Sequence, residues 1–349
     1  MQNDFPSSAG FSLVELMISA AVFGLITAQL LGVLSNQKRV YSSNERVLDV
    51  QEQARLTLEL ISYDTRMAGF MVPLWSAVSS VDGGANGADR LCVSDASYFD
   101  FSGAASPLDS KTVSFNGASV TGVFSDHVTV SSLDIDGTVP ADEDFLRPSA
   151  VGAGNGGGII ISSPTQTFCA RITKITAGNN IYFEDHDTDD TVEYGNATKY
   201  ITAGVTAQLR AVPAQIYEVD QDPTVLELHR NGLLLATSIE DLQVEYWLDN
   251  AGTPNGVQDG DDEFPVNKLN NPDPPGGAIP ADMARVRRVR ISVLARTETG
   301  EGDDSAHGRL LGGKPALANR LAPAATDEFR RRSFSASILP RNLVAVGDN

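Results

Sequence analysis

The sequence predicts an α+β protein, in which a long N-terminal helix, membrane-embedded in its first half, packs against an antiparallel β-rich globular domain. Three observations lead to this prediction. An apolar run of 24 residues occupies positions 11–34, and a helical pattern without proline continues to residue 72. Short segments rich in β-branched residues then fill much of the chain. With 349 residues, 42% of them hydrophobic, the chain is large enough to bury a substantial core.

The apolar run is long enough to cross a bilayer. At ~1.5 Å per residue it makes about 36 Å of helix, whereas the hydrocarbon layer is ~30 Å thick. The sequence has no second run of this kind, so we expect one membrane span followed by a water-exposed body. Gly24 and Gly32 lie within the span. They either permit close helix packing or local melting, or they are ordinary glycines of a membrane helix.

The second half of the helix, residues 35–69, is expected to be amphipathic. Its apolar residues recur at spacings of three, four and seven and form one stripe on an otherwise polar surface. The stripe comprises Val40, Val47, Val50, Ala54, Leu58 and Ile61. Gly69 followed by Pro73 predicts the helix end. The stripe predicts packing on the globular domain, and a coiled-coil partner is the alternative.

Residues 70–349 are expected to form one β-rich domain. The predicted strands are 127–133, 158–162, 168–175, 180–184, 206–219, 224–230, 233–239, 242–249 and 288–297. Asn231-Gly232 predicts a tight hairpin turn, because this pair accepts positive φ angles. The Gly-, Pro- and Asp-containing intervals 76–126 and 250–283 are predicted to be surface loops.

Charge and cysteine content restrict the possible partners. The formal net charge of −19 argues against nucleic acid as the main partner, because contacts to phosphates depend on Lys and Arg. Cys92 and Cys169 are the only cysteines. In an exported domain they predict one disulfide that closes a long loop, and two buried free thiols are the alternative.

Two acidic clusters are candidate calcium sites, because calcium prefers six to eight oxygen ligands. The first spans residues 184–190. The second is the better candidate because its loop contains glycine, and its tentative ligands are Asp249, Asp259, Asp261 and Asp262. Neither has the EF-hand order, so a solvated acidic loop is the alternative.

The sequence contains no HExxH or G-x-S-x-G pattern, and we therefore predict no enzymatic activity and no other cofactor. Residues 152–157 fit G-x-G-x-x-G but are predicted to form a flexible loop, because a β-like run follows them.

The N-terminus reverses the order of a secretory signal peptide, because its small residues precede the apolar run. The stretch from Gly10 to Met17, GFSLVELM, resembles the class III signal of type IV pilins and type II secretion pseudopilins. The resemblance implies that residues 1–10 are a leader, which prepilin peptidase removes between Gly10 and Phe11. It also implies methylation of the new amine on Phe11, and lateral assembly of the helices into a filament.

Glu15 is the one carboxylate within the apolar run. In a filament of the kind that the resemblance implies, it would lie near the N-terminal amine of a neighbouring subunit. This pairing would offset desolvation and fix the register between helices. A position in the headgroup layer is the alternative. The leader departs from the family pattern because it lacks Lys and Arg, and Lys38 and Arg39 follow the span instead.

Four later segments resemble PilW-type minor pilins. They are residues 63–70, residues 239–246 with Asp249, residues 286–296, and residues 331–334 with 339–342. Residues 76–205 match no family that we recognise. The resemblance implies a structural minor pilin that helps to initiate type IV pilus assembly within a tip or priming complex. The alternatives are a J-type minor pseudopilin of type II secretion and an adhesin or ligand-binding pilin displayed at the tip.

The resemblance also implies partners and a location. The expected partners are prepilin peptidase, other minor pilins, the major pilin, the inner membrane and the pilus assembly machinery. We expect a single span in the bacterial inner membrane with the globular domain in the periplasm, followed by incorporation into the pilus at the cell surface.

Overall fold

The fold combines one long helix with two antiparallel sheets. The computed structural model describes residues 12–70, 72–81, 83, 87–94, 117–133, 157–163, 166–176, 178–183, 197–201, 209–220, 222, 225–248, 265–266, 286–297, 314–317 and 329–344. The chain divides into two compact units within the long helix, between Asp49 and Val50. This architecture, a long apolar N-terminal helix followed by an antiparallel β-rich domain, confirms the predicted fold class.

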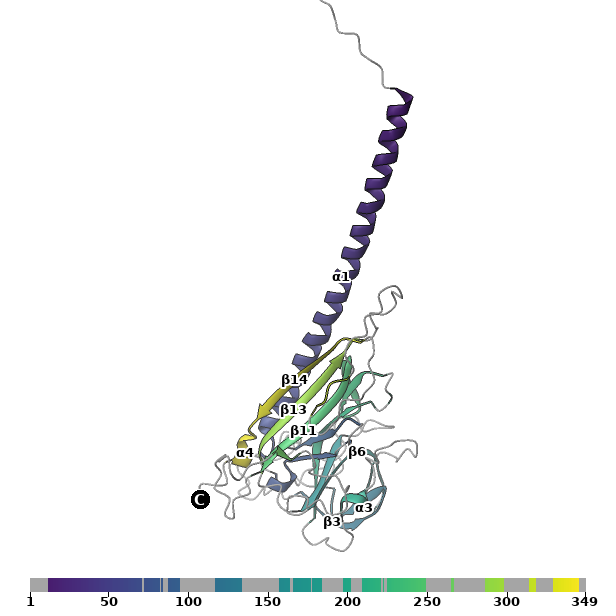
Figure 1. The fold of residues 1–349 in the computed structure, drawn as a ribbon. Helices are drawn as coiled ribbons and strands as arrows, with labels where there is room; N and C mark the ends of the chain where they lie inside the picture. Colours follow the sequence, from purple (N-terminus) through teal and green to yellow (C-terminus); the bar gives the residue numbers. More distant parts are fainter. Residues whose placement is uncertain are drawn as a thin grey trace, which may run out of the picture. The chain divides into compact units, whose positions relative to one another are not determined.

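Helix α1 extends without interruption from Leu13 to Met67 (Figure 1). Among the described residues it is the one helix long and apolar enough to cross a membrane. The buried part of the predicted stripe begins at Val50, and Ala54 and Ile61 are fully buried. Val40, at the start of the predicted stripe, is 55% exposed. The helix ends where the sequence predicted, because Gly69 adopts a left-handed φ of +83°.

Ten strands form the first sheet. They are β1 (Val78–Val81), β2 (Arg90–Val93), β3 (Ala118–Val123), β4 (His127–Val130), β5 (Gly158–Ser163), β6 (Gln166–Thr176), β7 (Asn180–Phe183), β8 (Arg210–Val219), β9 (Glu227–Arg230) and β10 (Leu233–Thr237). Strand β8 holds the sheet together. Its first half pairs with β3 and β5, and its second half pairs with β2 and β9.

The pairings of β8 close part of this sheet into a ring. The order β8-β3-β4-β7-β6-β5 returns to β8, and each step is antiparallel. Apolar side chains fill the interior, among them the fully buried Ile161, Phe168 and Ile181. The ring closes without a free edge in these pairings, which protects its strands from pairing with other chains. Five of the six strands of this small barrel come from the interval 76–205, for which we recognised no family in the sequence.

The second sheet has the order β12-β11-β13-β14. Its strands are β11 (Ile239–Leu248), β12 (Pro265–Val266), β13 (Val286–Arg296) and β14 (Arg331–Ile338), and β11, β13 and β14 lie side by side in Figure 1. Three short helical segments complete the described elements: η1 (Leu74–Ser76), α3 (Ala197–Tyr200) and α4 (Arg341–Val344).

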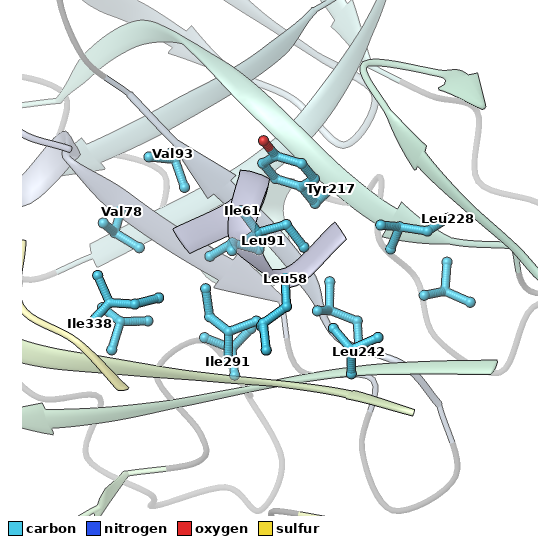
Figure 2. Close-up of a cluster of buried hydrophobic side chains, with 14 of the residues drawn as sticks. Leu58, Ile61, Val78, Leu91, Val93, Tyr217, Leu228, Leu242, Ile291 and Ile338 are labelled. Carbon is cyan, nitrogen blue, oxygen red and sulfur yellow. The ribbon is translucent and has the colours of Figure 1, made fainter. Parts of the chain in front are cut away.

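A second core joins α1 to strands of both sheets. Leu58 and Ile61 from the helix lie among Leu91, Tyr217, Leu242 and Ile291 (Figure 2). Burying a side chain of this size stabilises the fold by about 1.5–3 kcal/mol. The stripe from Val50 onward is therefore explained by packing within the chain, and the coiled-coil alternative is not needed for this face.

The prediction that residues 76–126 form surface loops is wrong. This interval contains β1, β2 and β3, and every residue of β1 and β2 is buried. The hairpin prediction is confirmed: Asn231 and Gly232 have φ values of +54° and +72° between the paired strands β9 and β10.

Candidate functional site

Glu15 lies in the first turn of α1, where it closes a capping box. Its Oε2 atom accepts a hydrogen bond from the Ser12 backbone N–H at 3.1 Å, and the Ser12 hydroxyl oxygen accepts one from the Val14 N–H at 3.3 Å. Two N–H groups that a helix start leaves without partners are thus satisfied. The carboxylate also lies at the positive end of the helix dipole, which stabilises its charge.

Sequence reasoning missed this arrangement, although Ser12 and Glu15 have the S-x-x-E spacing of a capping box ahead of an apolar run. Glu15 therefore has a hydrogen-bond donor within its own chain. Its pairing with the amine of a neighbouring subunit stays a prediction. Gly10 and Phe11, the predicted cleavage residues, lie outside the described residues.

Two hydroxyl groups of the apolar segment form hydrogen bonds within the helix. Ser19 Oγ donates to the Glu15 carbonyl oxygen at 2.7 Å, and Thr27 Oγ1 donates to the Phe23 carbonyl oxygen at 2.8 Å. Such bonds remove the penalty of an unpaired hydroxyl in hydrocarbon. An added Cβ at Gly24 or Gly32 would meet no atom within 4 Å. Neither glycine is therefore required by packing within the chain.

The C-terminal end of α1 is fixed by residues from distant strands and from α4. Asp64 Oδ2 accepts hydrogen bonds from the phenol of Tyr217 and, at 2.7 Å, from Arg230 Nη2. Asn342 Nδ2 donates to the carbonyl oxygens of Met67 and Ala68, each at 3.1 Å. These contacts give Asp64 and Asn342 physical roles in holding the end of α1 on the domain.

The two cysteines form a disulfide between β2 and β6, with a Cα–Cα distance of 6.1 Å. Both are fully buried, and the bond ties β2 to the barrel strand β6. The bond links residues 77 positions apart, as expected for a long closed loop.

Basic side chains near the end of the chain pair with acids within the domain. Arg331 contacts Glu240 through two nitrogen atoms, at 2.6 Å and 3.1 Å, and Arg296 approaches the same carboxylate at 3.5 Å. Arg290 lies 3.7 Å from Glu245. These contacts account for much of the basic patterning without a nucleic-acid partner.

The tentative calcium ligands Asp249, Asp259, Asp261 and Asp262, and the acidic cluster 184–190, lie outside the described residues. Within the described part of the chain, no group of three or more His, Cys, Asp or Glu side chains is arranged to hold a metal ion. Of the site residues predicted from the sequence, the structure brings Cys92 and Cys169 together in a disulfide. It also places Glu15 in a hydrogen bond with Ser12.

Three comparisons place these features beside known proteins. Residues 6–28 match the family model described as the prokaryotic N-terminal methylation motif. Among solved structures, the chain is similar to the type IV-like pilin TTHA1219 from Thermus thermophilus. The two are 18% identical over 54% of this chain and 85% of that chain, with a TM-score of 0.21. A TM-score this low does not establish a common fold. No curated protein sequence gives a significant match.

The matched segment contains Gly10, Phe11 and Glu15 and includes the first turns of α1. The chain thus carries an N-terminal methylation signal, followed by one continuous helix whose later turns belong to a β-rich body.

Proposed function

We propose that this chain is a minor pilin, a structural subunit that helps to initiate assembly of a type IV pilus after its leader is removed. Prepilin peptidase would cut between Gly10 and Phe11 and methylate the Phe11 amine. The inner membrane would hold residues 11–34 until the subunit joins other minor pilins and the major pilin through the assembly machinery. The body would face the periplasm before assembly and the cell surface afterwards.

The observation that supports this proposal most strongly is the methylation motif at residues 6–28, directly joined to α1. A signal of this order leaves the hydrophobic helix on the mature protein, whereas a secretory signal peptide is removed with its apolar segment. A subunit that keeps such a helix can be anchored first and packed against other helices later.

Glu15 is the residue proposed to set the register of that packing. A carboxylate in hydrocarbon costs at least ~2.5–3.5 kcal/mol on insertion scales, so it is retained where a partner compensates for it. In the single chain, Ser12 supplies a hydrogen bond but no positive charge. A neighbouring N-terminal amine would supply the charge, and only at the correct axial offset.

Two substitutions at Glu15 separate its roles. Glu15→Gln keeps an acceptor for the Ser12 N–H but removes the charge, whereas Glu15→Ala removes both. If register depends on charge, both variants should enter the membrane normally and lose incorporation into sheared filaments severalfold. Quantitative immunoblots of membranes and filaments measure this. Normal incorporation of Glu15→Gln would reject the charge role, and normal incorporation of both variants would reject any role in assembly.

Cleavage is tested separately. Gly10→Leu should preserve the full-length precursor on a gel, while the control Gly24→Ala should be processed normally because Gly24 has open space around it.

The neighbouring genes discriminate between a pilus and a type II secretion system: pilus genes would favour the PilW-type assignment, and secretion genes the J-type pseudopilin.

A further inference from the structure

A groove of about 490 Å³ opens between α1 and β10, within the unit that begins at Val50. It is lined by Gln53, Leu56, Thr57, Leu60, Leu234, Leu235, Ala236 and Thr237. Thr237 Oγ1 donates a hydrogen bond to Gln53 Oε1 at 2.9 Å and so ties the two walls together. Most of the lining is aliphatic, and the groove is therefore an apolar depression in a water-exposed domain.

Large apolar side chains are exposed on both walls of the groove. Leu56 on the helix is 60% exposed, and Leu234 on the strand is 55% exposed, with Leu233 beside it at 50%. Scattered exposed leucines need no explanation, but a contiguous apolar patch marks an interaction surface. Leu56 and Leu234 line one depression, and we therefore interpret it as a binding groove.

The border of the groove on the helix side is acidic. Glu52 and Glu59 stand four residues before and three residues after Leu56, so they flank it on the helix surface. Both are exposed, and neither forms an ion pair with any residue that the structure describes. Arg55, the cation between them in the sequence, instead lies 5.6 Å from the centre of the Phe334 ring. An occupant with positive charges beside an apolar stripe would complement this border.

The shape of β10 favours a helix over a strand as the occupant. The register of β10 against β9 shifts between Leu234 and Ala236, and such an irregularity at a sheet edge discourages the addition of another strand. An amphipathic helix needs no backbone pairing, because its apolar face packs directly on side chains. The groove already has a helix as one wall, which offers side-chain ridges for a second helix.

We propose that this groove binds a helix of a neighbouring subunit, one whose leucine-rich stripe is bordered by lysine or arginine. The inference rests on the proposed role in filament assembly and names the chemistry of one partner in it. The apolar walls supply affinity, and Glu52 and Glu59 select for positive charge.

The test uses the full-length protein in nanodiscs of zwitterionic lipid and two designed helical peptides. Both peptides carry the same leucine stripe, bordered by lysine in one and by glutamate in the other. We expect the lysine peptide to bind at least tenfold more tightly by fluorescence anisotropy, with affinity that falls as salt rises. Leu234→Gln should weaken binding at least tenfold. The double variant Glu52→Gln and Glu59→Gln should reduce the preference for lysine and its salt dependence.

Leu339→Gln is the matched control, because Leu339 is equally exposed, at 53%, but does not line the groove. It should bind like the unmodified protein, and circular dichroism should show that all variants are folded. Three results would overturn the proposal. They are equal binding of both peptides, equal peptide binding to empty nanodiscs, and an equal loss of affinity in Leu234→Gln and Leu339→Gln. Self-association that Leu234→Gln abolishes would assign the groove to a second copy and would also overturn it. Normal leader processing without peptide binding would reject the groove alone, whereas failed processing would reject the assembly role.

Discussion

Replacing Asp64 by alanine should destabilise the domain by about 2–4 kcal/mol. The Asp64 side chain is 11% exposed and accepts hydrogen bonds from Arg230 and from Tyr217, which is fully buried. Each hydrogen bond to a charged group contributes about 1.5–3 kcal/mol. Arg230 is 32% exposed and regains water when Asp64 is lost, whereas the Tyr217 phenol does not. The expected loss is therefore below the sum of two full contributions, and Tyr217→Phe should cost less, about 1–2 kcal/mol.

The assay is thermal unfolding of the full-length protein in nanodiscs, followed by the fluorescence of Trp75 and Trp247 with the disulfide kept oxidised. At about 2–4 °C per kcal/mol for a large domain, Asp64→Ala should lower the Tm by roughly 4–16 °C. Asp126→Ala is the matched control. That carboxylate is 59% exposed and bonds His127 at 2.7 Å, so the Tm should change little. Equal losses in the two variants, or an unchanged Tm for Asp64→Ala, would refute the reasoning.

The remaining stability predictions concern the disulfide, two tyrosines and the helix end. Replacing both Cys92 and Cys169 by alanine should lower the free energy of unfolding by about 2–5 kcal/mol, because the bond closes a loop between residues 77 positions apart. Reductant should lower the Tm of the unmodified protein toward that of the variant; an equal effect on the variant would contradict this. Burial raises the pKa of the Tyr217 and Tyr246 phenols above the ordinary 10.0. The contribution of this pKa difference to the free energy of unfolding is complete below pH 10. It falls as the pH rises, by up to ~1.4 kcal/mol per pH unit for each tyrosine, because the tyrosines of the unfolded chain ionise first. Urea unfolding from pH 8 to 11 should show this decline in the free energy of unfolding, and Tyr246→Phe should make the decline shallower. An unchanged dependence on pH in Tyr246→Phe would reject the contribution of Tyr246. Asn342→Ala should cost about 1–2 kcal/mol, because the carbonyl groups of Met67 and Ala68 at the end of α1 lose their donor. Hydrogen exchange at residues 64–68 should rise, and unaltered exchange there would contradict the capping role.

The sequence predicted the helix and many strands because their signals are local. The stripe from Val50 to Ile61 follows helical periodicity, and Asn231-Gly232 has one favoured turn geometry. Runs rich in β-branched residues, such as Gly158–Ser163, predicted strands for the same reason. These signals need no knowledge of what the segment contacts.

Strands β1 to β3 were missed because their residues look like a loop. Serine is abundant in the β1 sequence, VSSV, yet all four residues are buried. Their hydroxyls find partners far along the chain: Thr167 Oγ1 donates to Ser79 Oγ at 2.9 Å. The neighbouring Ser76 and Ser162 hydroxyl oxygens lie 2.6 Å apart. A buried serine with such a partner costs little, and its sequence neighbours do not reveal the partner.

The site was predictable only in part. The S-x-x-E spacing of Ser12 and Glu15 was visible in the sequence, whereas Asp64 and Arg230 are 166 residues apart and needed the fold. The groove beside β10 likewise depends on strand pairing and on which helix face is buried.

The barrel also changes how the adhesin hypothesis can be tested. Deleting residues 76–205 removes β1 to β7 and leaves β8 without its partners β2, β3 and β5. Loss of pili after this deletion would therefore follow from unfolding alone. Substitutions of exposed barrel residues such as Phe124, which is 48% exposed, test attachment without removing strands.

Mass spectrometry of the N-terminus from sheared filaments tests the central claim most directly. The account predicts a mature chain that begins at Phe11, carries one added methyl group on its amine, and is recovered in the fibre. A protein that works with residues 1–10 still attached would contradict it.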